Sequence, residues 1–292
     1  MSARDNLAGG HGRNLSWEQA VAAMLEDPEQ ASLARDCYFD GTPAEAGARY
    51  WASAEWQAAR RLLPEAAGGA LDVGAGRGIV SYALAKDGWR VSALEPDPSS
   101  LVGAGAIRDL VAATCYPIDV VESFGENLPF EDGRFHLIVA RQSLHHARDL
   151  WAMTRELHRV LRPGGRLLAL RDHVISAARD LPRFYQVHPL HRLYGGEHAY
   201  LLGEYTAALK EAGFNVNEVI GPLESPINYA PLTPATLAAG IAEQIPDFIF
   251  SRRTARRLLR SPVIMSMALK LLARVDNRPG RLYSFIAERA RA

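Results

Sequence analysis

A glycine-rich loop in the first third of the chain restricts the possible folds more than any other feature. The loop LDVGAGRG, residues 71–78, begins in a short apolar stretch and is followed by a helical stretch, residues 79–87. Glycine lets the backbone approach a ligand closely, and the amino end of a helix offers unpaired N–H groups and a partial positive charge. The order of strand, loop and helix therefore predicts a site for a nucleotide-type ligand.

Two details separate this loop from the dinucleotide fingerprint Gly-x-Gly-x-x-Gly. The third glycine, Gly78, comes one residue early, and an acid, Asp72, stands just before the loop. A carboxylate there suits a cationic amino group better than a pyrophosphate. Glu95 follows the next predicted strand and can accept hydrogen bonds from both ribose hydroxyls, which NAD and S-adenosylmethionine (SAM) share. Its alternative interpretation is a surface carboxylate.

Short apolar segments alternate with helical ones up to about residue 172. The alternation predicts a parallel sheet that is covered by helices on both faces, a doubly wound Rossmann-like α/β fold. Helices are expected at 79–87 and 150–161, with a Pro-Gly-Gly turn at 163–165. Strands are expected at residues 70–73, 90–94, 116–120, 135–140 and 166–170.

Six segments, in this order and spacing, resemble the class I SAM-dependent methyltransferases, in particular the group with UbiE-like motifs. The resemblance covers residues 70–172. Its segments are LDVGAGRG at 71–78, ALEPD at 93–97, GENLPF at 125–130, FHLIV at 135–139, LHH at 144–146 and ELHRVLRPGG at 156–165.

The resemblance implies that SAM binds at the carboxyl ends of the strands and leaves as S-adenosylhomocysteine. Asp72 would help to hold the ammonium group and Glu95 the ribose. Relatives often have an aspartate where this chain has Phe124, so Phe124 is expected either to pack on the adenine or to lie in the core. The residues expected to bind the cofactor are Asp72, Gly74, Ala75, Gly76, Glu95, Pro96, Phe124, Gly125, Glu126, Arg141 and Gln142.

The resemblance also implies a seven-stranded sheet whose last strand is antiparallel, with strands at 214–220 and 281–287. Helices at 17–26 and 44–63 are expected to form an N-terminal lid over the cofactor or to pack against the sheet. The predicted organisation is a flexible tail at 1–14, the lid at 15–67, the SAM-binding core at 68–230, a helical insertion at 231–278 and the final core strand at 279–292.

Histidines near the strand ends are candidates for a general base, which an oxygen acceptor requires. His145 follows the fourth strand and His173 the fifth, and either is the expected catalytic base. No metal site is expected, because the spacing of His188, His191 and His198 lacks a convincing helical repeat. The residues expected to contact the substrate are His146, Arg171, His188, His191, Tyr194 and Tyr50.

Charge and cysteine content exclude several classes of protein. Basic and acidic residues both number 33, so the basic excess typical of nucleic-acid binding is missing and no nucleic-acid partner is expected. Cys37 and Cys115 form no CxxC pair, which favours a reducing compartment. Residues 1–14 lack the apolar run of a signal peptide, and a cytoplasmic location is expected.

The segment 251–278 is locally basic, with eight lysines and arginines against one acid, Asp276. Its apolar second half could lie on an anionic membrane and reach a lipid-linked substrate. It could also grip a phosphorylated or acidic acceptor. We favour a helix packed on the core or on another subunit, so the membrane surface is not the preferred partner and a homodimer remains open.

The sequence thus predicts an enzyme that transfers a methyl group from SAM to a small-molecule acceptor, with oxygen favoured over carbon or nitrogen. One alternative is a SAM-binding protein with other chemistry, similar to a pericyclase or a decarboxylase, because a fold does not fix a reaction. A methyltransferase for a lipid-linked substrate and an NAD-dependent oxidoreductase are further alternatives.

Overall fold

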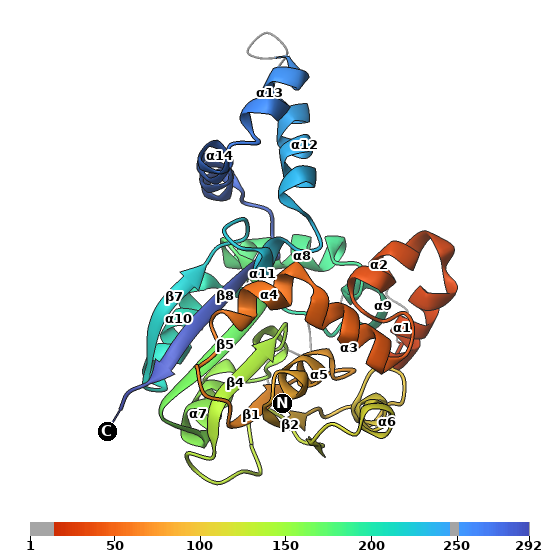
Figure 1. Ribbon diagram of the computed structural model, residues 1–292, viewed down its shortest axis with the longest axis vertical. Coiled ribbons are helices and arrows are strands. Elements are labelled where there is room, and N and C mark those ends of the chain that lie inside the picture. The colour runs from red at the N-terminus through yellow and green to blue at the C-terminus, as the bar shows by residue number, and fades with distance from the viewer. Residues whose placement is uncertain (1–14, 246–250, 292) are drawn as a thin grey trace.

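A single mixed sheet forms the centre of the molecule in a computed structural model that describes residues 15–245 and 251–291 (Figure 1). The strand order is β3-β2-β1-β4-β5-β8-β7, and the two-residue β6 pairs with β5. The strands are β1 (Gly69–Val73), β2 (Arg90–Leu94), β3 (Ile118–Val121), β4 (Phe135–Arg141), β5 (Leu161–Ile175), β6 (Tyr200–Leu201), β7 (Phe214–Ile220) and β8 (Arg281–Arg289).

The directions of the strands confirm the predicted doubly wound α/β fold with an antiparallel last strand. Strands β1 to β5 pair in parallel, whereas β8 runs antiparallel to both β5 and β7. The main path has the seven strands predicted, and β6 makes an eighth that is too short for a periodicity to reveal.

Strand β5 is longer than predicted, because Leu161–Ile175 replaces the expected 166–170. The Pro-Gly-Gly segment at 163–165 interrupts the pairing with β4 instead of preceding the strand, and the register shifts between Phe135 and Leu137. The extension at the other end carries Asp172 and His173 into the sheet, where they pair with β8.

The N-terminal helices differ from the prediction at two points, of which the first is an additional helix at 31–36. The expected helix 44–63 is two helices, because Ser53 ends the first and caps the second by accepting a hydrogen bond from the backbone N–H of Trp56. These helices and their neighbours are α1 (Trp17–Glu26), the 3₁₀ turn Pro28–Gln30, α2 (Ala31–Asp36), α3 (Pro43–Ala52) and α4 (Ala54–Arg60).

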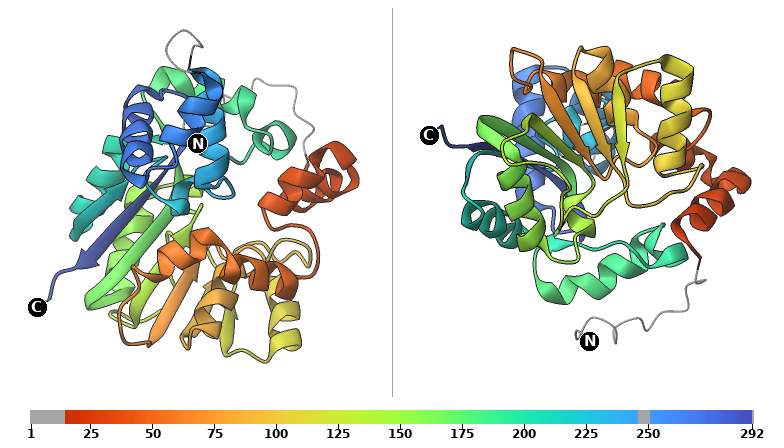
Figure 2. Two further views of the ribbon diagram at one scale, coloured as in Figure 1. Left: turned by 45° about the horizontal axis from the view of Figure 1, so that its top comes forward. Right: turned by 90° about the horizontal axis from the view of Figure 1, so that it is seen from below.

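Helices cover both faces of the sheet (Figures 1 and 2), and a hydrophobic cluster lies under each layer. The first layer includes α3, α4, α5 (Ile79–Lys86) and α6 (Ala104–Thr114), of which α6 was not predicted. The second layer includes α7 (Leu150–Val160) and α10 (Leu202–Glu211). The connections that follow the carboxyl ends of the strands contain α8 (Leu181–Val187), α9 (His191–Tyr194) and α11 (Pro226–Tyr229), with 3₁₀ turns at Leu144–His146 and Ala178–Asp180.

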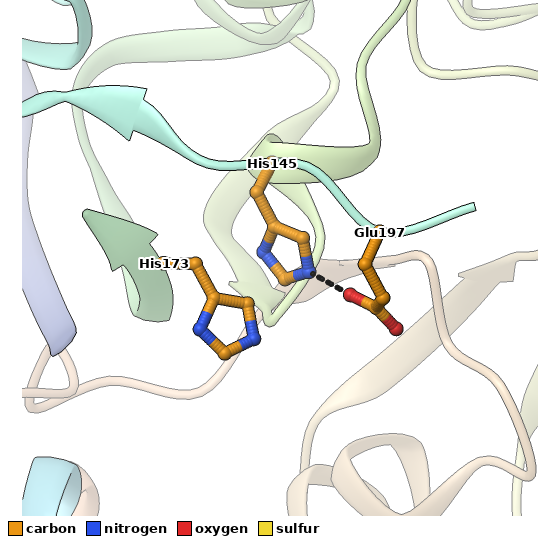
Figure 3. Close-up of side chains that lie close together, drawn as sticks. All are labelled: His145, His173 and Glu197. Carbon is orange, nitrogen blue, oxygen red and sulfur yellow. Dashed lines mark hydrogen bonds and ion pairs between the residues drawn. The ribbon is translucent and has the colours of Figure 1, made fainter. Parts of the chain in front are cut away.

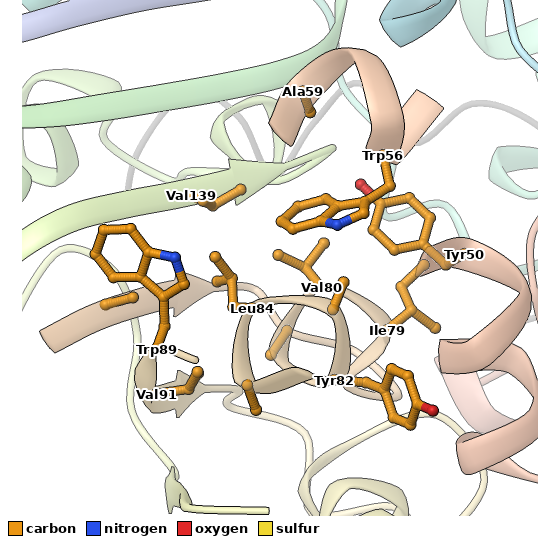
Figure 4. Packing of buried hydrophobic residues seen from close by; sticks show 14 of the residues in the cluster. Tyr50, Trp56, Ala59, Ile79, Val80, Tyr82, Leu84, Trp89, Val91 and Val139 are labelled. Atoms are coloured by element: carbon orange, nitrogen blue, oxygen red, sulfur yellow. The ribbon is translucent and has the colours of Figure 1, made fainter. Parts of the chain in front are cut away.

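Two tryptophans attach the N-terminal helices to the first layer (Figure 4). The side chain of Trp56 is fully buried beside Tyr50 and Val80. Both indole N–H groups, from Trp51 and Trp56, donate to the carboxylate of Asp87 at the end of α5, at 2.9 and 3.1 Å. Burial of such large side chains with satisfied polar groups stabilises the joint between the helices and the sheet.

Helices α12 (Pro234–Gln244), α13 (Arg252–Leu258) and α14 (Pro262–Val275) form an arm that projects from the sheet (Figure 1). Their buried residues, such as Ala242, Leu259 and Met265, form a cluster of their own. Of the two favoured placements, packing on the core is wrong within the described residues, and packing on another subunit stays a prediction. Val263, Met267, Leu271 and Val275 are exposed. None of the described helices has the length and apolarity needed to cross a membrane.

Candidate active site

A cavity of about 400 Å³ lies at the carboxyl ends of β1, β2, β4 and β5. One continuous wall runs from the glycine loop to the histidines that follow β4 and β5. This is the edge at which parallel α/β sheets bind ligands, because the crossover connections separate there. The predicted cofactor residues, both candidate bases and half of the predicted substrate residues therefore share one space.

The glycine loop has the conformation that its sequence requires. Gly74 has φ +65°, and a Cβ atom there would lie 2.5 Å from the hydroxyl oxygen of Ser143. Gly76 and Gly78 also have positive φ angles. A residue with a side chain would thus be strained, and at Gly74 it would also fill space beside the loop.

Asp72 lies beneath the loop and is 1% exposed. Its carboxylate accepts a hydrogen bond of 2.6 Å from the hydroxyl of Ser81. Burial raises the pKa of the Asp72 carboxyl to about 7, because little solvent remains to stabilise the charge. A cationic ligand in the cavity would favour the ionised form.

Glu95 closes the loop from the end of β2. Its carboxylate accepts from the backbone N–H of Gly76 at 2.7 Å and of Asp97 at 3.0 Å. Burial raises its pKa despite these two bonds. Glu95 is 8% exposed and lines the cavity, so the interpretation as a surface carboxylate is wrong.

Phe124 is 51% exposed and lines the cavity, which rules out its alternative placement in the core. The guanidinium of Arg148 lies 4.9 Å from the ring centroid. Glu126 accepts from the backbone N–H of Arg148 at 2.7 Å, and Met153 packs against Gly125. These contacts shape a turn with an open aromatic face.

Backbone strain marks the ends of β4 and β5. Gln142 has φ +51° and Arg171 has φ +62°, which is uncommon for residues with long side chains and is often found at functional sites. Arg141 lines the cavity, but its guanidinium is already paired with Glu55 of α4, at 2.6 and 3.1 Å. Arg141 thus joins the cavity wall to the N-terminal helices.

His145 is fully enclosed between two carboxylates. Its Nδ1 lies 2.9 Å from Asp172 and its Nε2 lies 3.2 Å from Glu197 (Figure 3). Burial lowers the pKa of the imidazole, but the hydrogen bonds to Asp172 and Glu197 outweigh it and raise the pKa to about 9. The ring is therefore positively charged at neutral pH and has no free lone pair for a proton.

His173 has the opposite character. Its Nδ1 donates to the carbonyl oxygen of Gly280 at 3.0 Å, which leaves the lone pair on Nε2. Burial and the nearby charge of His145 hold its pKa well below the usual value. In Figure 3 this Nε2 points toward the space beside His145 and Glu197, so His173 is a neutral acceptor of hydrogen bonds in the cavity.

The structure brings most of the predicted residues to this cavity and leaves three outside its lining. Arg171 bonds to the carbonyl of Ile227, and His191 bonds to the carbonyl of Glu197. Tyr50 is buried against Trp56. The predicted residues that line the cavity are Asp72, Gly74, Ala75, Gly76, Glu95, Pro96, Phe124, Gly125, Glu126, Arg141, Gln142, His145, His146, His173, His188 and Tyr194.

Two acids at the site were not among the predicted site residues. Asp172 lies between two residues that were selected, and its position directly after the predicted strand could have drawn attention to it. Glu197 comes from the connection between α9 and β6 and contacts His145 across 52 positions of sequence. No local pattern reveals such a contact.

Among the described residues, one group could hold a metal ion. His145, His173 and Glu197 each offer a ligand atom, and these atoms lie within 4.8 Å of one another.

Comparison with known proteins agrees with this geometry. The strand order, the glycine loop and the cavity at the strand ends define a Rossmann-like domain of the methyltransferase type. Residues 71–169 match the family described as a methyltransferase domain. This match covers about a third of the chain, and over this region the chain is similar to the class I SAM-dependent methyltransferases.

Similar curated proteins share mainly this region. A demethylmenaquinone methyltransferase of Chlorobaculum tepidum is 34% identical over 119 residues, which are 40% of this chain and 46% of that protein. A ubiquinone biosynthesis O-methyltransferase of Pseudomonas aeruginosa is 28% identical over 178 residues, 56% of this chain and 69% of that protein. The chain spans less than half the length of the first curated relatives that it matches.

The fold is also that of solved structures with little sequence identity. The structure of the [4+2]-cyclase SpnF aligns with a TM-score of 0.54 and 16% identity, over 96% of this chain and 99% of that one. This likeness extends to the fold alone.

Proposed function

We propose that the protein transfers a methyl group from SAM to a small-molecule acceptor, with oxygen favoured over carbon or nitrogen. The observation that carries the proposal is the single cavity that joins the glycine loop and Glu95 to His145, His173 and Glu197. A cofactor held by the loop would have polar groups across the same space, where an acceptor must be oriented and lose a proton.

The sulfonium of SAM supplies an activated methyl group, so the protein has to align the acceptor and receive its proton. Of the two histidines predicted as the base, the geometry favours His173. Its Nε2 has an available lone pair, whereas both ring nitrogens of His145 are engaged. The methyl group moves from sulfur to the acceptor oxygen, and the hydroxyl proton moves to Nε2 of His173.

The wall opposite the sheet suits an acceptor with an apolar body. Trp17 of α1, Leu33 of α2 and Phe39 of the segment after α2 line the cavity. Leu190 lines it from the segment after α8. Such side chains exclude water from the reacting atoms when they close over a ligand. An aromatic or otherwise apolar compound with a hydroxyl group is the class of acceptor that we propose.

The second candidate function is a SAM-binding protein with chemistry other than methyl transfer. The chain has the same fold as a structure described as a cyclase. A fold does not define a reaction, so chemistry other than methyl transfer is a second candidate. Release of S-adenosylhomocysteine separates the two functions, because only methyl transfer consumes SAM in this way.

The test is turnover of SAM with a panel of phenols, catechols, hydroxyquinones and matched amines, followed by mass spectrometry of both products. We expect S-adenosylhomocysteine and a methylated hydroxyl compound in equal amounts. His173→Gln should lower kcat at least tenfold with little change in SAM affinity, because a base in the transition state contributes about 10²–10⁴-fold. His158→Gln is the matched control, because His158 of α7 packs against Phe214 and does not line the cavity.

Binding of SAM without release of S-adenosylhomocysteine by any acceptor class would favour the second candidate. Full turnover in His173→Gln would rule out His173 as the proton acceptor.

A further inference from the structure

Three side chains from distant parts of the sequence meet at the deep end of the cavity (Figure 3). His145 comes from the 3₁₀ turn after β4, His173 from β5, and Glu197 from the connection between α9 and β6. Their exposed fractions are 1%, 8% and 6%. Burying polar groups costs free energy unless they have partners. Two imidazoles and a carboxylate that are buried in one place therefore point to a common ligand.

Each of the three groups is held by an outer hydrogen bond that leaves an inner atom directed at the others. Nδ1 of His173 donates to the carbonyl of Gly280, and Nδ1 of His145 faces Asp172. The hydroxyl of Tyr194 donates to Oε1 of Glu197 at 2.9 Å. Metal-binding histidines nearly always donate their second ring N–H to a carboxylate or a carbonyl in this way.

Distances between the inner atoms fit a common ion. Nε2 of His145 and Oε2 of Glu197 are 3.2 Å apart, and the three ligand atoms lie within 4.8 Å of one another. Metal bonds of about 2.1 Å place two ligands of one ion about 3–4.2 Å apart. Small rotations of the side chains are enough to bring all three atoms to bonding distance.

We propose that His145, His173 and Glu197 bind a divalent transition-metal ion. Two imidazoles and one carboxylate suit ions such as Zn²⁺ or Fe²⁺, whereas Mg²⁺ and Ca²⁺ prefer oxygen ligands throughout. Three protein ligands leave positions open on the side of the cavity, and these can take water or an oxygen of the acceptor. This proposal departs from the expectation of no metal site, which was based on the spacing of His188, His191 and His198.

The role of the ion rests on the proposed function, since the ion would lie beside the acceptor. Ion binding itself can be measured without turnover. Ion binding at Nε2 of His145 would release the proton that this nitrogen shares with Glu197. Nε2 of His173 has one lone pair, which can take either a proton or the ion. In an ion-bound protein the acceptor oxygen would take an open position on the ion, and coordination would lower the pKa of its hydroxyl. The hydroxyl proton would then leave to water, and His173 would act as a metal ligand in place of its role as the proton acceptor.

The test uses the full chain, stripped with a chelator and dialysed. Titration calorimetry with Zn²⁺ and absorption spectroscopy with Co²⁺ give affinity, stoichiometry and coordination geometry. We expect one ion per chain and visible Co²⁺ bands of a four- or five-coordinate site with nitrogen and oxygen ligands. His173→Gln and Glu197→Gln should each weaken binding at least tenfold, while His158→Gln should leave it unchanged.

Asp172→Asn tests the outer contact separately. The ring of His145 would lose its carboxylate anchor but keep its Nε2, so metal affinity should fall by about 10–100-fold without loss of the site. Calorimetry with S-adenosylhomocysteine reports for every variant that the cofactor half of the cavity is still folded.

Weak Zn²⁺ binding that His173→Gln and Glu197→Gln do not alter, in variants that still bind S-adenosylhomocysteine, would overturn the proposal. Methyl transfer by fully stripped protein, at a rate that Zn²⁺, Co²⁺ or Fe²⁺ does not raise, would also overturn it and would leave the proposed function intact. Specific metal binding in a protein that never releases S-adenosylhomocysteine would support the site and contradict methyl transfer.

Discussion

At the scale of single residues, Asp72 is a buried acid beside the loop that is expected to bind the cofactor. It is the acid that precedes the glycine loop, yet it is 1% exposed and has Ser81 as its hydrogen-bond donor. A carboxylate in such a place stays ionised at neutral pH only in part, because its pKa is raised to about 7 by burial. A cationic ammonium group would therefore bind best at a pH at which the Asp72 carboxyl is already ionised.

We predict that affinity for S-adenosylhomocysteine falls as the pH drops through 7. With a pKa of about 7 in the free protein, binding that requires the ionised form should weaken roughly 25-fold between pH 7.5 and 5.5. Calorimetry across this range measures the slope. Asp72→Asn should bind weakly with a nearly flat profile, and a slope that persists in Asp72→Asn would assign the titration to another group such as Glu95.

The same shift has the opposite effect on the ligand-free protein. The unfolded chain ionises near its ordinary value of 3.8, before the folded protein does, so this residue makes the fold less stable as the pH rises from about 4 to 7. Binding of the cofactor compensates for that loss in the pH range where the enzyme would work.

At the scale of elements, Arg77 connects the glycine loop to the N-terminal helices. Its guanidinium donates to the backbone carbonyls of Tyr38, Phe39 and Gly41, in the segment between α2 and α3. Three carbonyl oxygens on one cation hold this segment over the cavity. If the loop holds a cofactor, its binding would be linked through Arg77 to the position of the segment between α2 and α3.

We predict that Arg77→Ala frees the segment 37–42 without unfolding the sheet. Hydrogen exchange of its amides should become at least tenfold faster, and the dissociation rate of S-adenosylhomocysteine should rise by a similar factor. Arg155→Ala is the matched control, because Arg155 is exposed on α7, away from the segment 37–42. Equal exchange rates in the two variants would show that other contacts hold the segment.

At the scale of the whole molecule, the sequence predicted those parts that depend on local order. The loop at 71–78 and strands β1, β2, β4 and β7 follow from glycine spacing and apolar runs, which act over a few residues. The break at Ser53 was missed because a single hydroxyl, through its bond to Trp56, competes with an otherwise continuous helical pattern. Propensity averaged over a window does not resolve one cap.

Parts of the site that depend on long-range contacts could not be predicted. His145 was selected by its motif, but its two carboxylates come from 27 and 52 positions away. Without them, a charged histidine cannot be told from a free base, and the choice between His145 and His173 stayed open. The bond from His173 to Gly280 spans 107 positions and determines which ring nitrogen faces the cavity.

For the molecule as a whole, we predict that S-adenosylhomocysteine stabilises the fold and that NAD does not. A ligand at 100 times its dissociation constant raises the free energy of unfolding by about 2.7 kcal/mol. Thermal unfolding with each compound at equal concentration measures the difference. A matching shift with NAD would support the dinucleotide interpretation of the loop.

The place of β8 has a consequence for how the protein is made. Residues 281–289 pair with β5 on one side and β7 on the other. The edge of the sheet that consists of β8 and β7 therefore cannot form until these residues have been synthesised. The glycine loop and its neighbours can fold during synthesis, since β1 to β5 pair in parallel without β8. Gly280 and Ser284 are synthesised after these strands, and they bond to His173 and Arg171. The nascent chain would therefore be able to bind a cofactor before the acceptor side of the cavity is complete.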